Sequence, residues 1–444
     1  MTGLMHSTKR RFLSSADWLK SVAYKAIYKS SVNCWIPLNI RFQEAKLRAR
    51  VKKGGRVRVC FFAMSLAMWR YQSVYERLMS DKRFEVYVVL SPSRLWDAAE
   101  RERNLSELRQ FFNAKGVTFI DWDAKAQNSS VDVRREINPD ILFYPQQYKS
   151  VHFHDHCYRR FMNKLFCWCM YGMSVYEDAR FYNTEFLNIA WKLFYNNQSE
   201  LKAAERLADN KGRNVVITGY PNMTEYLSPN QNDVWKIKEP NVKRLIWAPH
   251  YSINPEGDEL YRSNFLWMAD EMVKLARQYA DRLQIAFKPH PKLRTRLYEH
   301  PQWGREKTDE YYRLWAEMPN TQLETGQFID LFKTSDAMVH DSASFQIEYL
   351  YVNKPVMYVL RKKIDEDITD ISEKALECHY IGKSMDDIRR FVDMVFDGED
   401  TMREKREQYY QQYLLPENGP DVGLNMYNEI ITTLRLESIG CSVS

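Results

Sequence analysis

The sequence predicts an α/β protein of two domains that face each other across a cleft, preceded by a basic helical arm. Three observations indicate this architecture. Short apolar runs alternate with segments of helical spacing after residue 56, a pattern typical of mostly parallel sheets covered by helices. A polar stretch over 227–242 divides the runs into two series. A length of 444 residues suffices for two domains of ordinary size, each with its own core.

The predicted arm, residues 1–55, carries the positive charge of the chain. Residues 1–56 hold thirteen Lys and Arg and two acids, a balance of +11, so the remainder carries −5 within a total of +6. Residues 17–29 have helical periodicity with Lys20 and Lys25 off the apolar face, which comprises Trp18, Leu19, Val22, Ala23, Ala26 and Ile27. This pattern suits an anionic membrane surface; the alternative is a helix packed on the body. The acidic body and the missing motifs argue against nucleic acid.

The first domain is predicted over 56–226. Strands are expected at 57–63, 84–90, 117–122, 140–145, 164–171, 191–195 and 214–219. The segment that follows the first strand should face the cleft and contains Trp69, Arg70 and Tyr71. We expect the two rings to suit stacking on a sugar of the acceptor and Arg70 to suit a phosphate. The alternative is that these residues pack at the start of the helix predicted over 69–80.

The second domain is predicted over 243–414, and its chemistry gathers at strand ends. His250 and His290 each lie just past an apolar strand and beside a proline. They should therefore share the rim at the carboxyl ends of the strands, where an imidazole can bind a phosphate or move a proton. Lys288, beside His290, could neutralise a diphosphate. The segment 415–444 is expected to contain a helix that crosses back to the first domain.

The stretch 336–360 reads as one strand, polar turn, helix and strand unit. Lys354-Pro355 ends the helix, because proline cannot continue the hydrogen-bond ladder. Ser342 and Ser344 would place hydroxyls beside the unpaired amides of the helix start, which favours an anion such as phosphate. The alternative is a capped helix with no ligand.

Other features limit the possibilities further. No apolar run is long enough for a membrane-spanning helix and no secretory signal is evident, so we expect a cytoplasmic protein, peripheral on the inner face of the cytoplasmic membrane. Residues 152–156 alternate His with other residues, a pattern that suggests a metal site. Because no second ligand cluster accompanies them, no metal is predicted, and a polar cleft loop with His154 or His156 as an alternative base is favoured.

Three motifs resemble those of the CDP-glycerol glycerophosphotransferase family of teichoic-acid and capsule polymerases. They are Trp247-Ala248-Pro249-His250, Lys288-Pro289-His290-Pro291, and Asp341 to Glu348 followed by Asn353-Lys354-Pro355. The family's third motif usually reads Asp-Tyr-Ser-Ser, three apolar residues and an acid; Asp341, Ser344 and Glu348 match it, whereas Ser342 and Ala343 depart.

The resemblance implies two Rossmann-like domains in the GT-B arrangement and a metal-independent transferase with no cofactor. The donor, CDP-glycerol or a related CDP-linked polyol, would be bound by the second domain, and a lipid-linked or polysaccharide acceptor by the first. His250 would do acid–base work, and His290 and Ser344 would hold the diphosphate. The remaining donor-binding residues would be Lys288, Asp341, Ser342 and Glu348, the last on ribose or base hydroxyls.

Three alternatives remain open at this point. A glycosyltransferase of the same fold would release CDP or UDP, whereas glycerol-phosphate transfer would release CMP. The stretch from Asp341 to Glu348 is also similar to that of nucleotide-sugar 2-epimerases, which act without an acceptor. A binding protein that has lost the chemistry would tolerate the loss of both His250 and His290.

Overall fold

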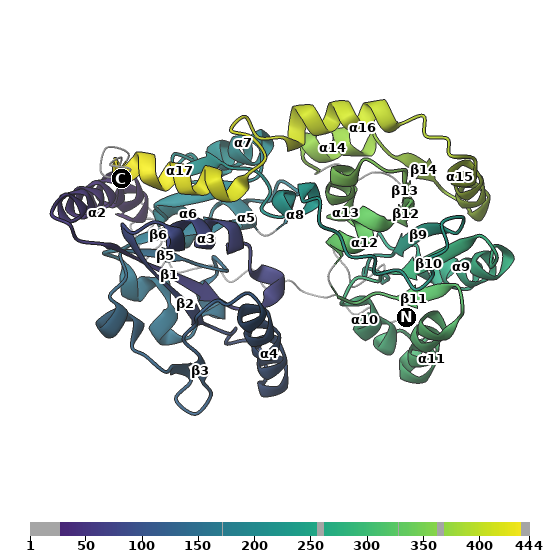
Figure 1. Cartoon of the computed structure of the whole chain (residues 1–444), viewed down its shortest axis with the longest axis horizontal. Coiled ribbons are helices and arrows are strands. Elements are labelled where there is room, and N and C mark those ends of the chain that lie inside the picture. The colour runs from purple at the N-terminus through teal and green to yellow at the C-terminus, as the bar shows by residue number, and fades with distance from the viewer. Residues whose placement is uncertain (1–26, 171, 255–261, 327, 362–367, 437–444) are drawn as a thin grey trace, which may run out of the picture.

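In this computed structural model the chain folds into two α/β domains that lie side by side (Figure 1). The structure describes residues 27–170, 172–254, 262–326, 328–361 and 368–436. The helix predicted over 17–29 lies almost wholly outside the described residues, as does the end of the segment predicted over 415–444. From Ser31 a π-helical turn, Ser31–Trp35, leads into α2 (Ile36–Lys52) and then into the first sheet.

The first domain is built on a six-stranded parallel sheet. In spatial order its strands are β2 (Phe84–Leu90), β1 (Val57–Ala63), β5 (Ile141–Phe143), β6 (Leu165–Cys169), β7 (Lys192–Tyr195) and β8 (Val215–Ile217). The helices of this half are α2, α3 (Gln72–Ser80), α4 (Ala98–Ala114), α5 (Ala179–Tyr182), α6 (Glu185–Ile189), α7 (Gln198–Leu207) and α8 (Met223–Leu227). Along β1, Val59 and Phe61 enter one core and Cys60 and Phe62 the other. Both faces of the sheet are therefore buried, as parallel sheets require.

The strand predicted at 117–122 is a point of difference. Of that run, Ile120 alone pairs with the sheet, through a parallel bridge to Val89. Beyond it the Asp121 carboxylate accepts from the Trp122 backbone N–H at 2.7 Å and from the Arg109 side chain at 2.9 Å. These bonds turn the chain away from the sheet edge into a small antiparallel pair, β3 (Trp122–Asp123) and β4 (Asn128–Ser129).

The second domain has the same architecture, and the strand order of its sheet also reverses at its first strand. Its parallel strands, in spatial order, are β11 (Thr321–Leu323), β10 (Leu283–Phe287), β9 (Lys243–Ala248), β12 (Ala337–His340), β13 (Val356–Val359) and β14 (Tyr380–Gly382). The chain adds β10 and β11 on one side of β9 and then returns to add β12 to β14 on the other. Such a reversal leaves a crevice at the carboxyl ends of the two central strands, where sheets of this type bind ligands.

The helices of the second half complete the domain and link it to the first. They are α9 (Phe265–Gln278), α10 (Leu293–Glu299), α11 (Gly304–Glu317), α12 (Ile329–Thr334), α13 (Phe345–Glu348), α14 (Asp370–Leu376), α15 (Met385–Asp397), α16 (Arg403–Tyr409) and α17 (Val422–Leu434). The helix expected after the polar turn is short, because α13 passes into a 3₁₀ turn, Tyr349–Val352. None of the described helices is long and apolar enough to cross a membrane.

Contacts of the last helix and contacts along the domain boundary join the domains. The last helix, α17, crosses back and packs on α3 and α2 of the first domain (Figure 1). Ion pairs between Arg77 and Asp421 and between Lys192 and Glu429 accompany this packing. At the centre, the ring of Tyr226 in α8 stacks on that of Tyr351 with centroids 5.2 Å apart.

Candidate active site

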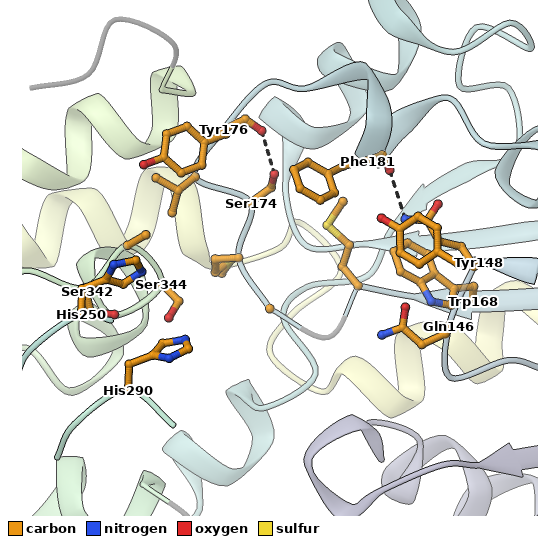
Figure 2. Close-up of a pocket in the computed structure, with 16 residues that line it drawn as sticks. Gln146, Tyr148, Trp168, Ser174, Tyr176, Phe181, His250, His290, Ser342 and Ser344 are labelled. Carbon is orange, nitrogen blue, oxygen red and sulfur yellow. Dashed lines mark hydrogen bonds between the residues drawn. The ribbon is translucent and has the colours of Figure 1, made fainter. Parts of the chain in front are cut away.

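A cavity of about 380 Å³ lies between the carboxyl ends of the two sheets (Figure 2). This volume is within the range of small-molecule sites. The second domain lines it with His250, His290 and the run Ser342–Ser344. His250 follows β9 and Ser342 follows β12, so the polar wall of the cavity sits at the reversal point of the second sheet. Three sequence stretches thus converge on one cavity.

The two histidines are held side by side by their strands. The Lys288 backbone N–H donates to the Trp247 carbonyl at 2.8 Å, and the His290 N–H donates to the Pro249 carbonyl at 3.1 Å. The ladder between β9 and β10 thereby continues one step beyond the strands. It brings the rings of His250 and His290 to a centroid distance of 5.4 Å.

The hydrogen-bond partners of the two Nδ1 atoms differ in kind. The backbone N–H of Lys292 donates to His290 Nδ1 at 3.1 Å. Because an amide N–H can only donate, the proton of neutral His290 must be on Nε2. His250 Nδ1 lies 2.7 Å from the hydroxyl of Ser252, which can donate or accept, and 3.3 Å from the Ser252 N–H. His290 is therefore fixed as a donor. The Ser252 N–H favours the same tautomer of His250, but the closer Ser252 hydroxyl can accept from Nδ1–H, so His250 can take either tautomer.

Both imidazoles are neutral at pH 7 in this structure. Burial, with a contribution from His290, lowers the pKa of His250 to about 3. Burial and the charge of Lys292 lower the pKa of His290 to about 4. Desolvation disfavours the imidazolium form, so an anionic ligand between the rings would counteract both shifts. Neutral Nε2–H groups can donate to phosphate oxygens.

Asp341 has a different role from the predicted one. Its carboxylate is buried and accepts from the His250 backbone N–H at 2.6 Å and from the backbone N–H of Asn264. It does not line the cavity. Burial raises its pKa to about 6 despite these bonds. Its oxygens fix the loop that carries His250, and the expected contact of Asp341 with the donor is not seen.

Ser342 and Ser344 lie where a phosphate site was predicted. Both line the cavity, the first buried and the second half-buried. Ser344 occupies the N-cap position of α13, yet its side chain makes no capping hydrogen bond. The alternative of a serine used as a cap is thus not realised, and the hydroxyl of Ser344 is available to a ligand.

Lys288 and Glu348, both predicted to contact the donor, point away from the cavity. The Lys288 ammonium donates to the Gly326 carbonyl at 2.8 Å, and burial lowers its pKa to about 8. Glu348 is buried beside Tyr220, which hydrogen bonds to it, and burial raises its pKa to about 7. Neither residue lines the cavity. Their expected contacts with diphosphate and ribose are therefore not seen.

The aromatic residues predicted to bind the acceptor belong to the core. Trp69 packs edge-on against Phe61 and Phe112, and the Tyr71 hydroxyl donates to the Tyr144 carbonyl at 2.7 Å. Both rings are buried, so neither can stack on a sugar, and the packing alternative is correct. Arg70 is half-buried, and its charge acts to lower the pKa of Glu348 across the domain boundary. Arg70 does not line the cavity.

The alternating histidines are dispersed. His152 Nε2 lies 2.8 Å from the Gln146 carbonyl, and His156 Nδ1 lies 2.8 Å from the Ser91 hydroxyl. Both are buried within the first domain, and His154 is exposed. None of the three lines the cavity, so His154 and His156 are not placed to act as bases there. Among the described residues, no group of three His, Cys, Asp or Glu side chains is arranged to hold a metal.

No motif predicted the opposite wall of the cavity. It comes from the first domain and consists of Gln146, Gln147, Tyr148, Trp168, Met170, Gly172, Met173, Ser174, Val175, Tyr176 and Phe181. Tyr148 follows β5 and Trp168 lies in β6. The same strand-end rule that located His250 could have located the run 146–148.

Comparisons with known proteins agree with this architecture. The profile described as CDP-glycerol:poly(glycerophosphate) glycerophosphotransferase matches residues 179–413. Solved structures share the fold at low identity. S. aureus MnaA with UDP has a TM-score of 0.54 at 15% identity, covering 88% of this chain and 100% of that one. A variant of the wall teichoic acid polymerase TagF has 0.55 at 12%, covering 86% and 89%. The UDP-GlcNAc 2-epimerase of Neisseria meningitidis has 0.51 at 16%, covering 86% and 100%. No curated protein sequence matches this chain.

Proposed function

Since the chain belongs to the CDP-glycerol:poly(glycerophosphate) glycerophosphotransferase family, we propose that it transfers glycerol phosphate, or a related polyol phosphate, from a CDP-linked donor. The receiving group is a hydroxyl of a membrane- or lipid-linked surface polysaccharide. One observation carries the proposal: two neutral imidazoles, 5.4 Å apart, line one cavity with the hydroxyls of Ser342 and Ser344. Such a set of fixed donors suits a diphosphate.

The chemistry follows from the two tautomer environments. The acceptor oxygen forms a bond to the phosphorus that bears glycerol, the bond from that phosphorus to the bridging oxygen breaks, and CMP leaves. His290, fixed with its proton on Nε2, donates to the diphosphate and stabilises the charge of the leaving CMP. His250 accepts the proton of the attacking hydroxyl on Nε2 when Nδ1–H donates to Ser252. The diphosphate charge raises the pKa of His250 from its low value in this structure.

A released-nucleotide assay tests the proposal. The purified chain is incubated with CDP-glycerol, CDP-ribitol, UDP-glucose and UDP-N-acetylglucosamine, each with a lipid-linked saccharide acceptor, in the presence and absence of EDTA. We expect CMP from a CDP-polyol, at an unchanged rate in EDTA. Release of CDP or UDP would instead indicate glycosyl transfer, and epimerised UDP-sugar without acceptor would indicate an epimerase.

The surface of α2 supports a membrane location for this reaction. Trp35, Leu38 and Phe42 lie at the end of the π-helical turn and along α2, at helical spacing, and are 52%, 63% and 65% exposed. Arg41 and Lys46 are exposed between and beyond them. Exposed aromatic and aliphatic residues flanked by cations are typical of a helix that lies in an anionic membrane interface.

The opposite face of α2 packs on the first domain, and therefore the face with Leu38 and Phe42 points to solvent. Ile36, Leu47 and Val51 are buried against the first domain. The one acid of α2, Glu44, points inward and accepts from the Trp191 indole N–H at 2.8 Å. The outward face therefore carries no carboxylate to repel anionic lipid, and we propose that the protein is peripheral on the inner face of the cytoplasmic membrane.

A further inference from the structure

The first-domain wall of the cavity combines exposed aromatic rings with amides. Phe181 and Tyr148 are large apolar side chains that are 42% and 36% exposed where they line the cavity. Gln146 lies beside Tyr148, on the side away from the two catalytic histidines (Figure 2). Aromatic faces beside amide hydrogen-bonding groups suit a ligand with an apolar face and many hydroxyls.

The wall is held in position before any ligand binds. The Gln146 carbonyl lies 2.8 Å from His152 Nε2, which is buried. The side chain of Gln147 accepts from the Thr184 hydroxyl at 2.9 Å and donates to the Phe181 carbonyl at 3.4 Å. The loop after β5 and the start of the α5–α6 segment are thus joined, so the two rings keep their separation. Preorganisation of this kind lowers the cost of binding.

Two polar groups on this wall lack strong partners. The indole Nε1 of Trp168 is buried and has no hydrogen-bond partner among the described residues. The Gln146 side-chain amide makes a weak 3.6 Å contact with the Met68 sulfur. A buried N–H without an acceptor is costly. The side-chain amide of Gln146, which lines the cavity, can donate to a ligand oxygen in place of the Met68 sulfur.

Charge is the property that separates the possible acceptors. Among the described residues that line the cavity there is no Lys, Arg, Asp or Glu. A chain of glycerol phosphates carries a negative charge on every unit, and placing such a charge against an apolar wall without a cation is expensive. A sugar has no charge to compensate, and its ring can cover the aromatic side chains.

We infer that Tyr148, Trp168, Phe181 and Gln146 form the acceptor subsite and that the acceptor end is a neutral sugar. This inference rests on the proposed function and refines it: the hydroxyl that attacks the glycerol phosphate belongs to a saccharide. Its oxygen forms the new phosphodiester, CMP leaves with the bridging oxygen, and the hydroxyl proton passes to His250.

Direct binding tests the inference independently of turnover. Saturation-transfer NMR is recorded on the full chain with CMP and octyl glycosides of hexoses or N-acetylhexosamines, and with a synthetic glycerol phosphate trimer. We expect saturation of the sugar ring protons and weaker binding of the trimer. Absence of transfer to every glycoside, or tighter binding of the trimer, would overturn the inference.

Variants locate the subsite. Phe181→Ala and Tyr148→Ala should each weaken glycoside binding about tenfold, equivalent to about 1.4 kcal/mol, whereas Phe181→Tyr should retain it. Leu95→Ala, an exposed apolar residue outside the cavity, is the matched control. CMP release from CDP-glycerol should be unchanged in Leu95→Ala, which lies outside the cavity. If the unmodified protein releases no CMP from a CDP-polyol in the presence of a lipid-linked saccharide acceptor, the proposed donor chemistry fails, while the NMR result still decides the acceptor subsite. Equal binding by the unmodified protein and both alanine variants would contradict the assignment.

Discussion

In both domains a side-chain hydrogen bond lies at the point where the strand order reverses, but the side chain is a tyrosine in the first domain and an aspartate in the second. In each domain, one side chain ties the loop after the first strand to a loop beside it. In the first domain the Tyr71 hydroxyl donates to the Tyr144 carbonyl at 2.7 Å, and the aromatic ring fills the crevice. In the second domain the Asp341 carboxylate accepts from the His250 N–H at 2.6 Å, and the imidazole stays in the cavity.

The order of the strands therefore determines where a crevice forms, but not whether that crevice binds a ligand. The ring of Tyr71, which makes the hydrogen bond in the first domain, occupies the space that a ligand would need. A carboxylate tie is small and bonds to backbone, so it leaves the neighbouring side chain free to face the cavity. We therefore expect the second domain to provide the chemistry and the first to provide the acceptor wall and the membrane face.

Loss of His250 should have the largest effect. We expect His250→Ala to lower the rate of CMP release about 10³-fold, because a positioned acid–base group contributes about 10²–10⁴. Single-turnover release from CDP-glycerol with a glycoside acceptor measures it. His154→Ala, an exposed histidine of the first domain, is the control and should retain full activity. Equal losses in the two variants would contradict the assignment of the chemistry to the second domain.

Substituting each of the two residues that make these hydrogen bonds tests the comparison directly. Asp341→Asn places an amide NH₂ against backbone donors and should displace His250, so we expect the rate to fall about 10²-fold, the usual effect of misplacing a catalytic group by about 1 Å. Tyr71→Phe removes two buried hydrogen bonds, one to the Tyr144 carbonyl and one from the Cys169 N–H, and should cost about 1–3 kcal/mol in the free energy of unfolding. CMP release and urea unfolding measure the two effects.

The comparison predicts that Tyr71→Phe leaves the rate within about twofold, since its hydroxyl lies in the core and not in the cavity. An activity loss in Tyr71→Phe as large as that in Asp341→Asn would show that the first crevice also takes part in the chemistry.

The membrane face should be separable from the cavity. Replacing Trp35, Leu38 and Phe42 together by Ser should reduce binding to phosphatidylglycerol vesicles at least tenfold, because burying each of these side chains contributes about 1.5–3 kcal/mol. Vesicle co-sedimentation measures it, with donor hydrolysis unchanged. The matched control replaces three other exposed apolar residues by Ser: Met79, Leu95 and Leu227. Equal loss in the control would assign the binding to general hydrophobicity.

The polar wall could be predicted from sequence because position relative to a strand fixes direction. A residue just past a buried parallel strand must lie at the carboxyl edge, and this rule located His250, His290 and Ser342. The role of Asp341 could not be predicted in this way. Its partners are backbone amides of His250 and Asn264, which the strand register brings together and no side-chain pattern reveals.

The first domain resisted prediction for a related reason. Trp69 and Tyr71 suit a core as well as a sugar. Their burial depends on packing against Phe61 of β1 and Phe112 of α4, a tertiary arrangement that the local sequence does not reveal. The acceptor wall itself joins residues from three separate segments without a motif. Aromatic content signals a surface or a core, but tertiary packing decides between them.

The pH dependence of donor affinity should give the smallest effect and the finest test. In the free site the pKa of His290 is about 4, and the diphosphate of CDP-glycerol has no group that titrates between about pH 5 and pH 8. Its charge raises the pKa of His290 in the complex, so the complex holds more protons than the free site, and affinity must rise as pH falls. We expect the Kd from calorimetry to fall about threefold from about pH 8 to pH 5.5. His290→Gln should reduce the slope to the part that His250 contributes, and His154→Gln should keep it in full. An affinity that does not change with pH would show that the diphosphate does not contact the imidazole, because no proton is then taken up on binding.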